Sequence, residues 1–256
     1  MGKSNRTSQS NKPSKARNIA LDIIIVVALV IAGISAYKIY NIYKNYNKDQ
    51  KAYTQVQQEA EKDDGIDWVA LRATNSDVVG WIKLEGTNID YPIVKSHDND
   101  EYLHTLFDGS PGNAGCIFVD CNTKDPFKQF NTVVYGHHMK DGSMFENLSY
   151  FTDPSYAKEH GTFALFTPEQ DYDLEVAAFL NCPSDCEIYN PNAGTGDDED
   201  KNTIASREKY LDAIDKYAEY KTDVELTPQD KIVILSTCAY EYEGARYVIV
   251  GKLVQK

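Results

Sequence analysis

The chain has 256 residues, a formal net charge of −13 and five cysteines. This length is enough for one domain with a sizeable core, and the acidic balance argues against nucleic acid as a partner. Residues 1–21 carry basic side chains and no acidic ones. The remainder is therefore more acidic than the total indicates, which suits a domain that works in water outside a cell.

The N-terminal part of the sequence predicts a membrane anchor. Residues 1–18 are polar, basic and rich in Ser and Asn, which indicates a disordered tail. An uncharged apolar run from Ile23 to Tyr37 follows, and it continues past Lys38. A spanning helix needs about 20 apolar residues, so we predict a transmembrane signal anchor over residues 19–43. By the positive-inside rule, the tail stays in the cytoplasm and the rest of the chain lies outside.

Two other interpretations of this apolar segment are less favoured. A cleaved signal peptide has a shorter apolar region and a small-residue cleavage site, whereas this run is long and no clear site follows it. A buried core helix is disfavoured because no other segment of the chain matches its hydrophobicity. An uncleaved single-pass anchor therefore remains the prediction.

Beyond the anchor, residues 44–64 are polar helix formers and predict a helical stalk, and residues 66–79 begin with a further helix. Residues 65–256 are predicted to form an extracellular domain. From Val79 the pattern changes to short strands separated by Gly, Pro, Asn and Asp, which favours a β-barrel or sandwich. The strand candidates are residues 79–94 (a hairpin), 115–120, 131–137, 162–167, 174–180, 231–238 and 246–253.

Two helices are predicted among these strands. Asp153–His160 is short, whereas Thr203–Lys221 has apolar residues at three- and four-residue steps. The longer helix, packed between two strands of a barrel, could form the wall of a groove. The fold class is therefore mainly β with added helices.

The cysteines are Cys116, Cys121, Cys182, Cys186 and Cys238, and their odd number predicts at least one free thiol. The first two lie on opposite faces of one predicted strand, so a bond between them needs a bend. Cys182 and Cys186 flank Pro183 in a predicted loop and could pair. Their spacing has no second ligand pair nearby, so no metal site is predicted.

The chemistry is expected at the C-terminal pair of strands. The buried-looking strand KIVILSTC ends at Cys238, and Arg246 opens the next strand. If these strands are antiparallel neighbours, the guanidinium lies near the thiol, where it favours the thiolate and can donate to an oxyanion. His137 follows another strand end at Gly136. Histidine exchanges protons near neutral pH, and a Cys–His pair is the minimum for thiol acyl transfer.

Each of these residues alone has an ordinary explanation. A cysteine that ends a strand is usually a small buried hydrophobe, a histidine beside glycine is usually a turn residue, and an arginine at a strand start is usually a surface charge. Only their combination in this sequence context points to catalysis.

The runs YGHHMKDGSMF, LSTC and ARYVIVGKL resemble, in order, the three signatures of class B sortases of Gram-positive bacteria. The resemblance covers roughly residues 60–256 and includes NIDYPIV, DNDEYL and GCIFVD. It implies a sortase-like β-barrel with N-terminal helices and one long helix inserted before the strand of the catalytic cysteine. It also implies that neither a metal nor an organic cofactor is needed.

The resemblance assigns roles to individual residues. Cys238 corresponds to the nucleophile, His137 rather than His138 to the catalytic histidine, and Arg246 to the catalytic arginine. Ala239 departs from the glutamate often found there in the family, which removes any expectation of a carboxylate at this position. Residues implied in binding the substrate peptide are Ser236, Asn99, Leu103 and Tyr189, the last next to Ile188.

The implied activity is that of a cysteine transpeptidase. It cleaves a C-terminal sorting motif of Thr-Gly or Thr-Asn type in secreted proteins, through a thioacyl enzyme. It then joins them to an amine of a lipid-linked peptidoglycan precursor at the cell membrane. One alternative is a pilin-polymerising sortase with a Lys side chain as acceptor. Others are a cysteine protease, for which no partner that orients the histidine is marked, and a non-catalytic membrane-anchored binding domain.

Overall fold

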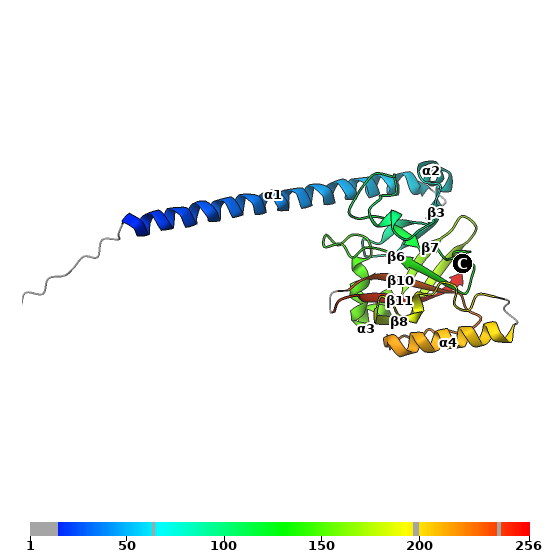
Figure 1. Ribbon diagram of the computed structural model, residues 1–256. Coiled ribbons are helices and arrows are strands. Elements are labelled where there is room, and N and C mark those ends of the chain that lie inside the picture. Colours follow the sequence, from blue (N-terminus) through cyan, green and yellow to red (C-terminus); the bar gives the residue numbers. More distant parts are fainter. Residues whose placement is uncertain (1–14, 63–64, 197–199, 240–241) are drawn as a thin grey trace, which may run out of the picture. The chain divides into compact units, whose positions relative to one another are not determined.

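The structure is a computed structural model that describes residues 15–62, 65–196, 200–239 and 242–256 (Figure 1). The chain divides into two compact units, residues 1–45 and 46–256. The helices are α1 (Lys15–Ala60), α2 (Trp68–Thr74), η1 (Glu101–Leu103), η2 (Glu146–Thr152), α3 (Pro154–His160), η3 (Glu187–Tyr189) and α4 (Lys201–Tyr217). The strands are β1 (Glu61–Lys62), β2 (Gly65–Ile66), β3 (Val78–Lys83), β4 (Asp90–Val94), β5 (Ile117–Val119), β6 (Asn131–Tyr135), β7 (Thr162–Phe166), β8 (Asp171–Pro183), β9 (Ala218–Lys221), β10 (Ile232–Cys238) and β11 (Ala245–Gln255).

Eight strands form a barrel in the order β11-β10-β6-β5-β4-β3-β7-β8, which closes where β11 pairs with β8. The long strand β8 makes this closure possible. β7 pairs with its first part, β9 with a later part of the same strand, and β11 with nearly its whole length. A barrel has few free edges, which explains why so many short strands are stable together. The predicted mainly β barrel is confirmed.

The apolar run of β10 explains its central place in the barrel. Val233 and Leu235 belong to the core inside the barrel, whereas Ile232 and Ile234 pack in a second core with residues of α4. Because both faces are buried, the strand is continuously apolar instead of alternating. This rigid strand carries the segment Ser236–Cys238 to its end.

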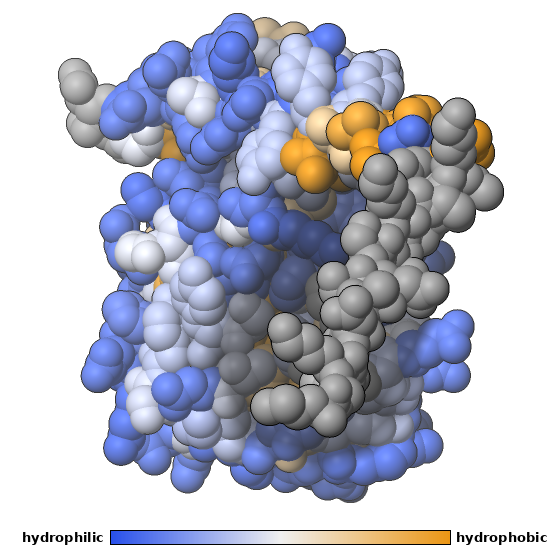
Figure 2. All heavy atoms as spheres, turned by 90° about the vertical axis from the view of Figure 1, so that its left-hand side faces the viewer, coloured by the Kyte–Doolittle hydropathy of each residue, from blue (hydrophilic) through white to orange (hydrophobic). Residues whose placement is uncertain are grey.

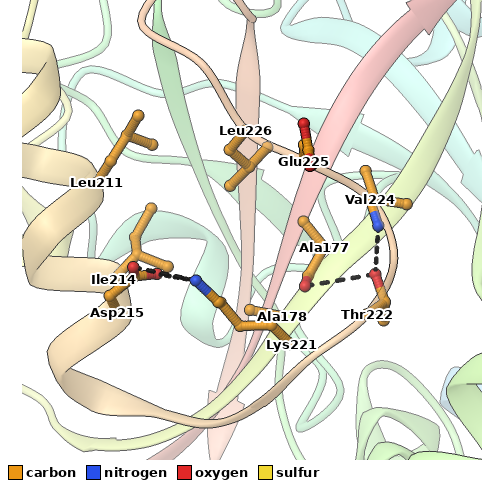
Figure 3. A pocket seen from close by; sticks show the side chains of 10 residues that line it. All are labelled: Ala177, Ala178, Leu211, Ile214, Asp215, Lys221, Thr222, Val224, Glu225 and Leu226. Carbon is orange, nitrogen blue, oxygen red and sulfur yellow. Dashed lines mark hydrogen bonds and ion pairs between the residues drawn. The ribbon is translucent and has the colours of Figure 1, made fainter.

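Helix α4 covers the second core. Its first turn is capped by Asp200, whose carboxylate accepts from the backbone N–H of Thr203 at 3.0 Å. A cavity of about 380 Å³ lies between α4, β8 and the segment after β9. Lys221 pairs with Asp215 there at 3.0 Å, and Figure 3 shows the side chains that line the cavity. None of the residues predicted for catalysis or substrate binding lines this cavity.

The predicted helix over residues 203–221 is wrong at its C-terminal end. Helix α4 ends at Tyr217, and Ala218–Lys221 form β9, which pairs with Ala178–Leu180 of β8. The sequence AEYK contains good helix formers, but pairing with the edge of β8 outweighs this local preference.

Helix α1 contains the predicted anchor. Within the described residues it is the one helix long and apolar enough to cross a membrane, and its large apolar side chains at Ile19 and from Ile23 to Tyr43 are exposed. Figure 2 shows a group of exposed apolar residues in orange, whereas most other coloured residues in that view are hydrophilic and appear blue or pale. Of the tail predicted over residues 1–18, residues 1–14 lie outside the described part of the chain, and Lys15 begins the helix.

The predicted stalk over residues 44–64 is not a separate element. From Tyr46 onward α1 belongs to the same compact unit as the barrel, and Tyr53, Val56 and Ala60 are buried in its core. The helix ends at Ala60, and residues 63–64 of the predicted stalk lie outside the described part. The polar composition conceals a narrow apolar stripe that docks on the domain.

Asp49 fastens this end of α1 to the segment before β5. Its buried carboxylate accepts from the backbone N–H groups of Asn113 and Ala114 at 2.9 and 3.1 Å. Tyr53 reinforces the contact because its hydroxyl donates to the carbonyl of Gly115. Residues 46–60 are therefore structural parts of the barrel domain.

We expect Asp49→Ala to lower the free energy of unfolding by about 1–3 kcal/mol, because two backbone donors lose their acceptor in a buried position. Urea unfolding followed by circular dichroism measures the change. The matched control is Lys48→Ala, which removes an exposed side chain that donates to the carbonyl of Pro111 at 2.7 Å. The control should change stability by less than about 0.5 kcal/mol, and equal effects of both substitutions would contradict the prediction.

Candidate active site

The parallel pairing of β6 with β10 brings two chain segments to one edge of the barrel. Tyr135 is the register partner of Ser236, and the N–H of Gly136 donates to the carbonyl of Ser236 at 3.1 Å. Parallel strands end at the same edge, so His137 and Cys238 emerge there together. Figure 1 shows β6, β10, β11 and β8 as neighbours in the barrel.

The antiparallel hairpin of β10 and β11 adds the third residue. Cys238 and Arg246 are direct register partners at the turn end of this hairpin, as the sequence predicted. Both side chains are partly exposed, whereas Ser236 and Thr237 just before the cysteine are buried. The thiol therefore stands at the rim of a rigid strand with a guanidinium group on the neighbouring strand.

A groove of about 240 Å³ unites all the residues predicted for the site. It contains the three residues predicted to be catalytic and the four predicted to bind the substrate peptide. Its lining consists of Asn99, Leu103, Phe118, Tyr135, Gly136, His137, Ser184, Tyr189, Ser236, Thr237, Cys238 and Arg246.

The fold and the groove agree with the results of comparisons with known proteins. A family model described as the sortase domain matches residues 82–254. This chain belongs to the sortase family. Its members are cysteine transpeptidases of the cell wall, and the resemblance to class B sortases is confirmed.

Individual relatives support this family at moderate identity. Sortase B of Listeria monocytogenes is 38% identical over 171 residues, which cover 66% of this chain and 66% of that protein. The crystal structure of sortase B from Bacillus anthracis in complex with AAEK1 has a TM-score of 0.70 and 31% identity, and the match covers 84% of this chain and 100% of that one. The Staphylococcus aureus sortase B–substrate complex has a TM-score of 0.71 and 26% identity, with 83% and 99% covered.

The histidine of this sortase is held in one orientation by the backbone. Nε2 of His137 lies 2.8 Å from the carbonyl oxygen of Leu103 at the end of η1. A carbonyl only accepts, so Nε2 carries a proton in this contact, and Nδ1 is the nitrogen left for proton exchange. The ring also stacks on His104, with centroids 6.0 Å apart.

Two of the predicted substrate-binding residues contact each other. The hydroxyl of Tyr189 lies 2.8 Å from Oγ of Ser236, which joins η3 to the end of β10. Burial raises the pKa of Tyr189, so its hydroxyl stays neutral at working pH. The Tyr189 ring stacks on Tyr135, with centroids 6.1 Å apart. Together they form an aromatic wall on which an extended peptide can lie.

Asn99 lines the groove, but its side-chain amide is already occupied. Nδ2 donates to the buried carboxylate of Asp120 at 3.0 Å, and Oδ1 accepts from the N–H of Cys121 at 2.8 Å. The same carboxylate accepts from the hydroxyl of Tyr135 at 3.0 Å. Burial and then Asp120 raise the pKa of Tyr135. Asp120 thus connects the loop of Asn99 to β6, which ends two residues before His137.

Several residues in and around the groove were not predicted from the sequence. Tyr135 stands two residues before His137, where the strand pattern alone could have placed it at the same barrel edge. Asp120 and Ser184 gave no such signal, because their roles depend on partners that are distant in sequence. The missed lining residues are Phe118, Tyr135, Gly136, Ser184 and Thr237.

We expect Tyr189→Phe to raise KM for a sorting peptide about 3- to 10-fold, with a smaller change in kcat, because Ser236 loses a hydrogen bond worth about 1 kcal/mol. Steady-state cleavage kinetics measure both constants. Tyr217→Phe is the matched control, since its hydroxyl donates to Glu187 at 3.0 Å on an exposed surface. A fall confined to kcat would argue against a binding role.

Proposed function

We propose that this sortase cleaves a C-terminal sorting motif of Thr-Gly or Thr-Asn type, with Cys238 as nucleophile, His137 as acid and base, and Arg246 as oxyanion stabiliser. The observation that carries the proposal is that these three side chains line one groove together with Ser236, Leu103 and Tyr189.

In the first half-reaction, the Cys238 thiolate attacks the carbonyl carbon of the threonine. The oxyanion that forms is stabilised by the guanidinium of Arg246 from the neighbouring strand. The imidazolium of His137 protonates the departing amine as the peptide C–N bond breaks. The products are a thioester on Cys238, a neutral imidazole and a released C-terminal peptide.

In the second half-reaction, an amine attacks the thioester carbonyl. The neutral imidazole of His137 takes the amine proton, and the thiolate of Cys238 leaves as the new amide bond forms. We propose an amine of a lipid-linked peptidoglycan precursor as the acceptor. The secreted protein thereby becomes covalently attached to the cell wall.

The domain organisation fits this role. We propose that residues 19–43 of α1 anchor the protein in the cell membrane, with the basic N-terminus in the cytoplasm and residues 46–256 outside. The exposed apolar side chains of α1 support the anchor, and the basic residues that precede it support the orientation. The enzyme would then act where secreted proteins meet lipid-linked wall precursors.

The test is a panel of fluorescence-quenched sorting peptides that differ in their last two motif positions. A soluble form that begins near residue 46 is incubated with each peptide, with and without triglycine or free lysine. Cleavage whose product becomes an amide of triglycine supports attachment to the wall precursor. Amides formed only with lysine would instead indicate pilin polymerisation. Hydrolysis unaffected by either amine would indicate a protease, and no cleavage of any peptide would favour a binding domain.

A further inference from the structure

Two cysteines outside the catalytic set lie against each other beside the groove. Cys182 is near the end of β8, and Cys186 follows after the turn Pro183–Asp185. Their sulfur atoms are 3.1 Å apart, so only a small movement separates them from the S–S distance of about 2.05 Å in a disulfide. The side chains are almost completely buried, with exposed fractions of 0% and 6%. The turn therefore already holds the two sulfurs against each other.

The pair lies at the junction of the elements that form the groove. Cys182 is the register partner of Arg246 on β11. Ser184, within the turn, lines the groove, and its N–H donates to the carbonyl of Gly244 in the β10–β11 hairpin at 3.0 Å. Cys186 leads directly into η3, which carries Tyr189. The segment between the two thiols thus forms part of the groove wall.

We propose that Cys182 and Cys186 form a disulfide that stabilises this wall of the groove. The oxidant is a small-molecule disulfide, such as oxidised glutathione. An extracellular domain meets an oxidising environment in which such bonds persist. The persistence of the bond outside the cell and its effect on the groove rest on the location and function proposed above, whereas the contact between the two sulfurs does not.

The bond forms by thiol–disulfide exchange in two steps. The Cys186 thiolate attacks one sulfur of the oxidant and releases one thiolate, which leaves a mixed disulfide on Cys186. The Cys182 thiolate then attacks the Cys186 sulfur and releases the second thiolate. The two protons lost by the protein thiols pass to the two released thiolates, and the oxidant gains two electrons.

The environment of the two thiols favours this order of attack. The hydrogen bond with Cys186, followed by burial, raises the pKa of the Cys182 thiol, and the same hydrogen bond lowers the pKa of the Cys186 thiol. Cys186 is also the less buried of the two. It therefore ionises first and is the thiol that an oxidant meets.

Cys116 offers an internal control for the proposal. It is as buried as the pair, but its thiol contacts the carbonyl of Thr105 at 3.3 Å and the hydroxyl of Tyr53 at 3.4 Å instead of another sulfur. Burial raises its pKa to about 12. A reaction that depends on a neighbouring sulfur should therefore spare Cys116.

The experiment uses the full-length Cys238→Ala protein in detergent, so that the result does not depend on catalysis or on oxidation of the nucleophile. The protein is refolded in a buffer of reduced and oxidised glutathione, quenched in acid, denatured, alkylated with N-ethylmaleimide and mapped by mass spectrometry. We expect the peptide with Cys182 and Cys186 to lack alkylation and to be lighter by two hydrogen atoms. Cys116 and Cys121 should be alkylated.

Thermal unfolding gives a second, independent readout. Closing this short loop should raise Tm by roughly 4–8 °C relative to the reduced protein. The double variant Cys182→Ala/Cys186→Ala, in the same background, should unfold at a temperature that does not depend on the redox buffer. Cys238→Ser can replace Cys238→Ala if the alanine variant does not fold.

Two results would overturn the proposal. One is alkylation of both Cys182 and Cys186 to the same extent as Cys116 in the refolded protein. The other is a disulfide from either of them to Cys121. Loss of peptide cleavage by the wild-type enzyme would count against the proposed function, and it would leave the thiol mapping unaffected.

Discussion

Replacement of Cys238 by alanine should lower kcat/KM for cleavage of a sorting peptide by roughly 10⁴-fold or more, because the proposed acyl intermediate is a thioester on this sulfur. The change removes only a sulfur atom from a partly exposed side chain at the end of β10. Stability should therefore change by less than about 1 kcal/mol. Cleavage assays with quenched peptides and a Tm measurement separate the two effects.

Cys121→Ala is the matched control for this substitution. Cys121 is also a partly exposed free cysteine, but its thiol does not line the groove. This variant should retain activity within about twofold, because it keeps the backbone N–H that donates to Asn99 and removes only a thiol outside the groove lining. Full activity in Cys238→Ala, or its loss in Cys121→Ala alone, would mean that the nucleophile lies elsewhere.

His137→Ala should lower kcat by roughly 10²- to 10⁴-fold, with KM affected much less, since the leaving amine loses its proton donor. The carbonyl of Leu103 fixes the ring of His137 through Nε2. A histidine held in this way exchanges its proton through Nδ1. His137→Gln keeps a polar side chain, but it is not expected to restore the rate because the amide of glutamine cannot exchange a proton. The pH dependence of kcat/KM for wild type and variant reports whether one proton-exchanging group has been lost.

The neighbouring His138→Ala provides the comparison. His138 follows in the same segment, but it does not line the groove, and its ring lies 6.5 Å from that of Tyr247. Its substitution should lower kcat far less than that of His137, after correction for any fall in Tm. An equal or larger loss in His138→Ala would reassign the acid–base role.

The sequence was sufficient for the parts of this molecule that depend on local pattern. The apolar run before Cys238 predicted a buried strand, and the spacing to Arg246 predicted a hairpin that aligns the two residues; both are confirmed. Strand periodicity also located the hairpin at Val79–Val94. These features follow from side-chain alternation and turn chemistry, which act over a few residues.

Other features depend on contacts that no local pattern encodes. Residues 218–221 have helical composition and become a strand only because an edge of β8 is available. The segment from Tyr46 is polar enough to resemble a stalk, yet Asp49 finds its two donors at Asn113 and Ala114, far along the chain. Asp120 joins Asn99 and Tyr135 in the same way. In each case tertiary pairing decides the outcome.

Strand β11 links the completion of the barrel to the completion of the groove. It is the most C-terminal strand, it closes the barrel against both β10 and β8, and it carries Arg246. Of the described residues that line the groove, Arg246 alone follows Cys238 in the chain. The strand that closes the barrel therefore also supplies the last side chain of the groove, so a change that detaches β11 would open the barrel and dismantle the groove together.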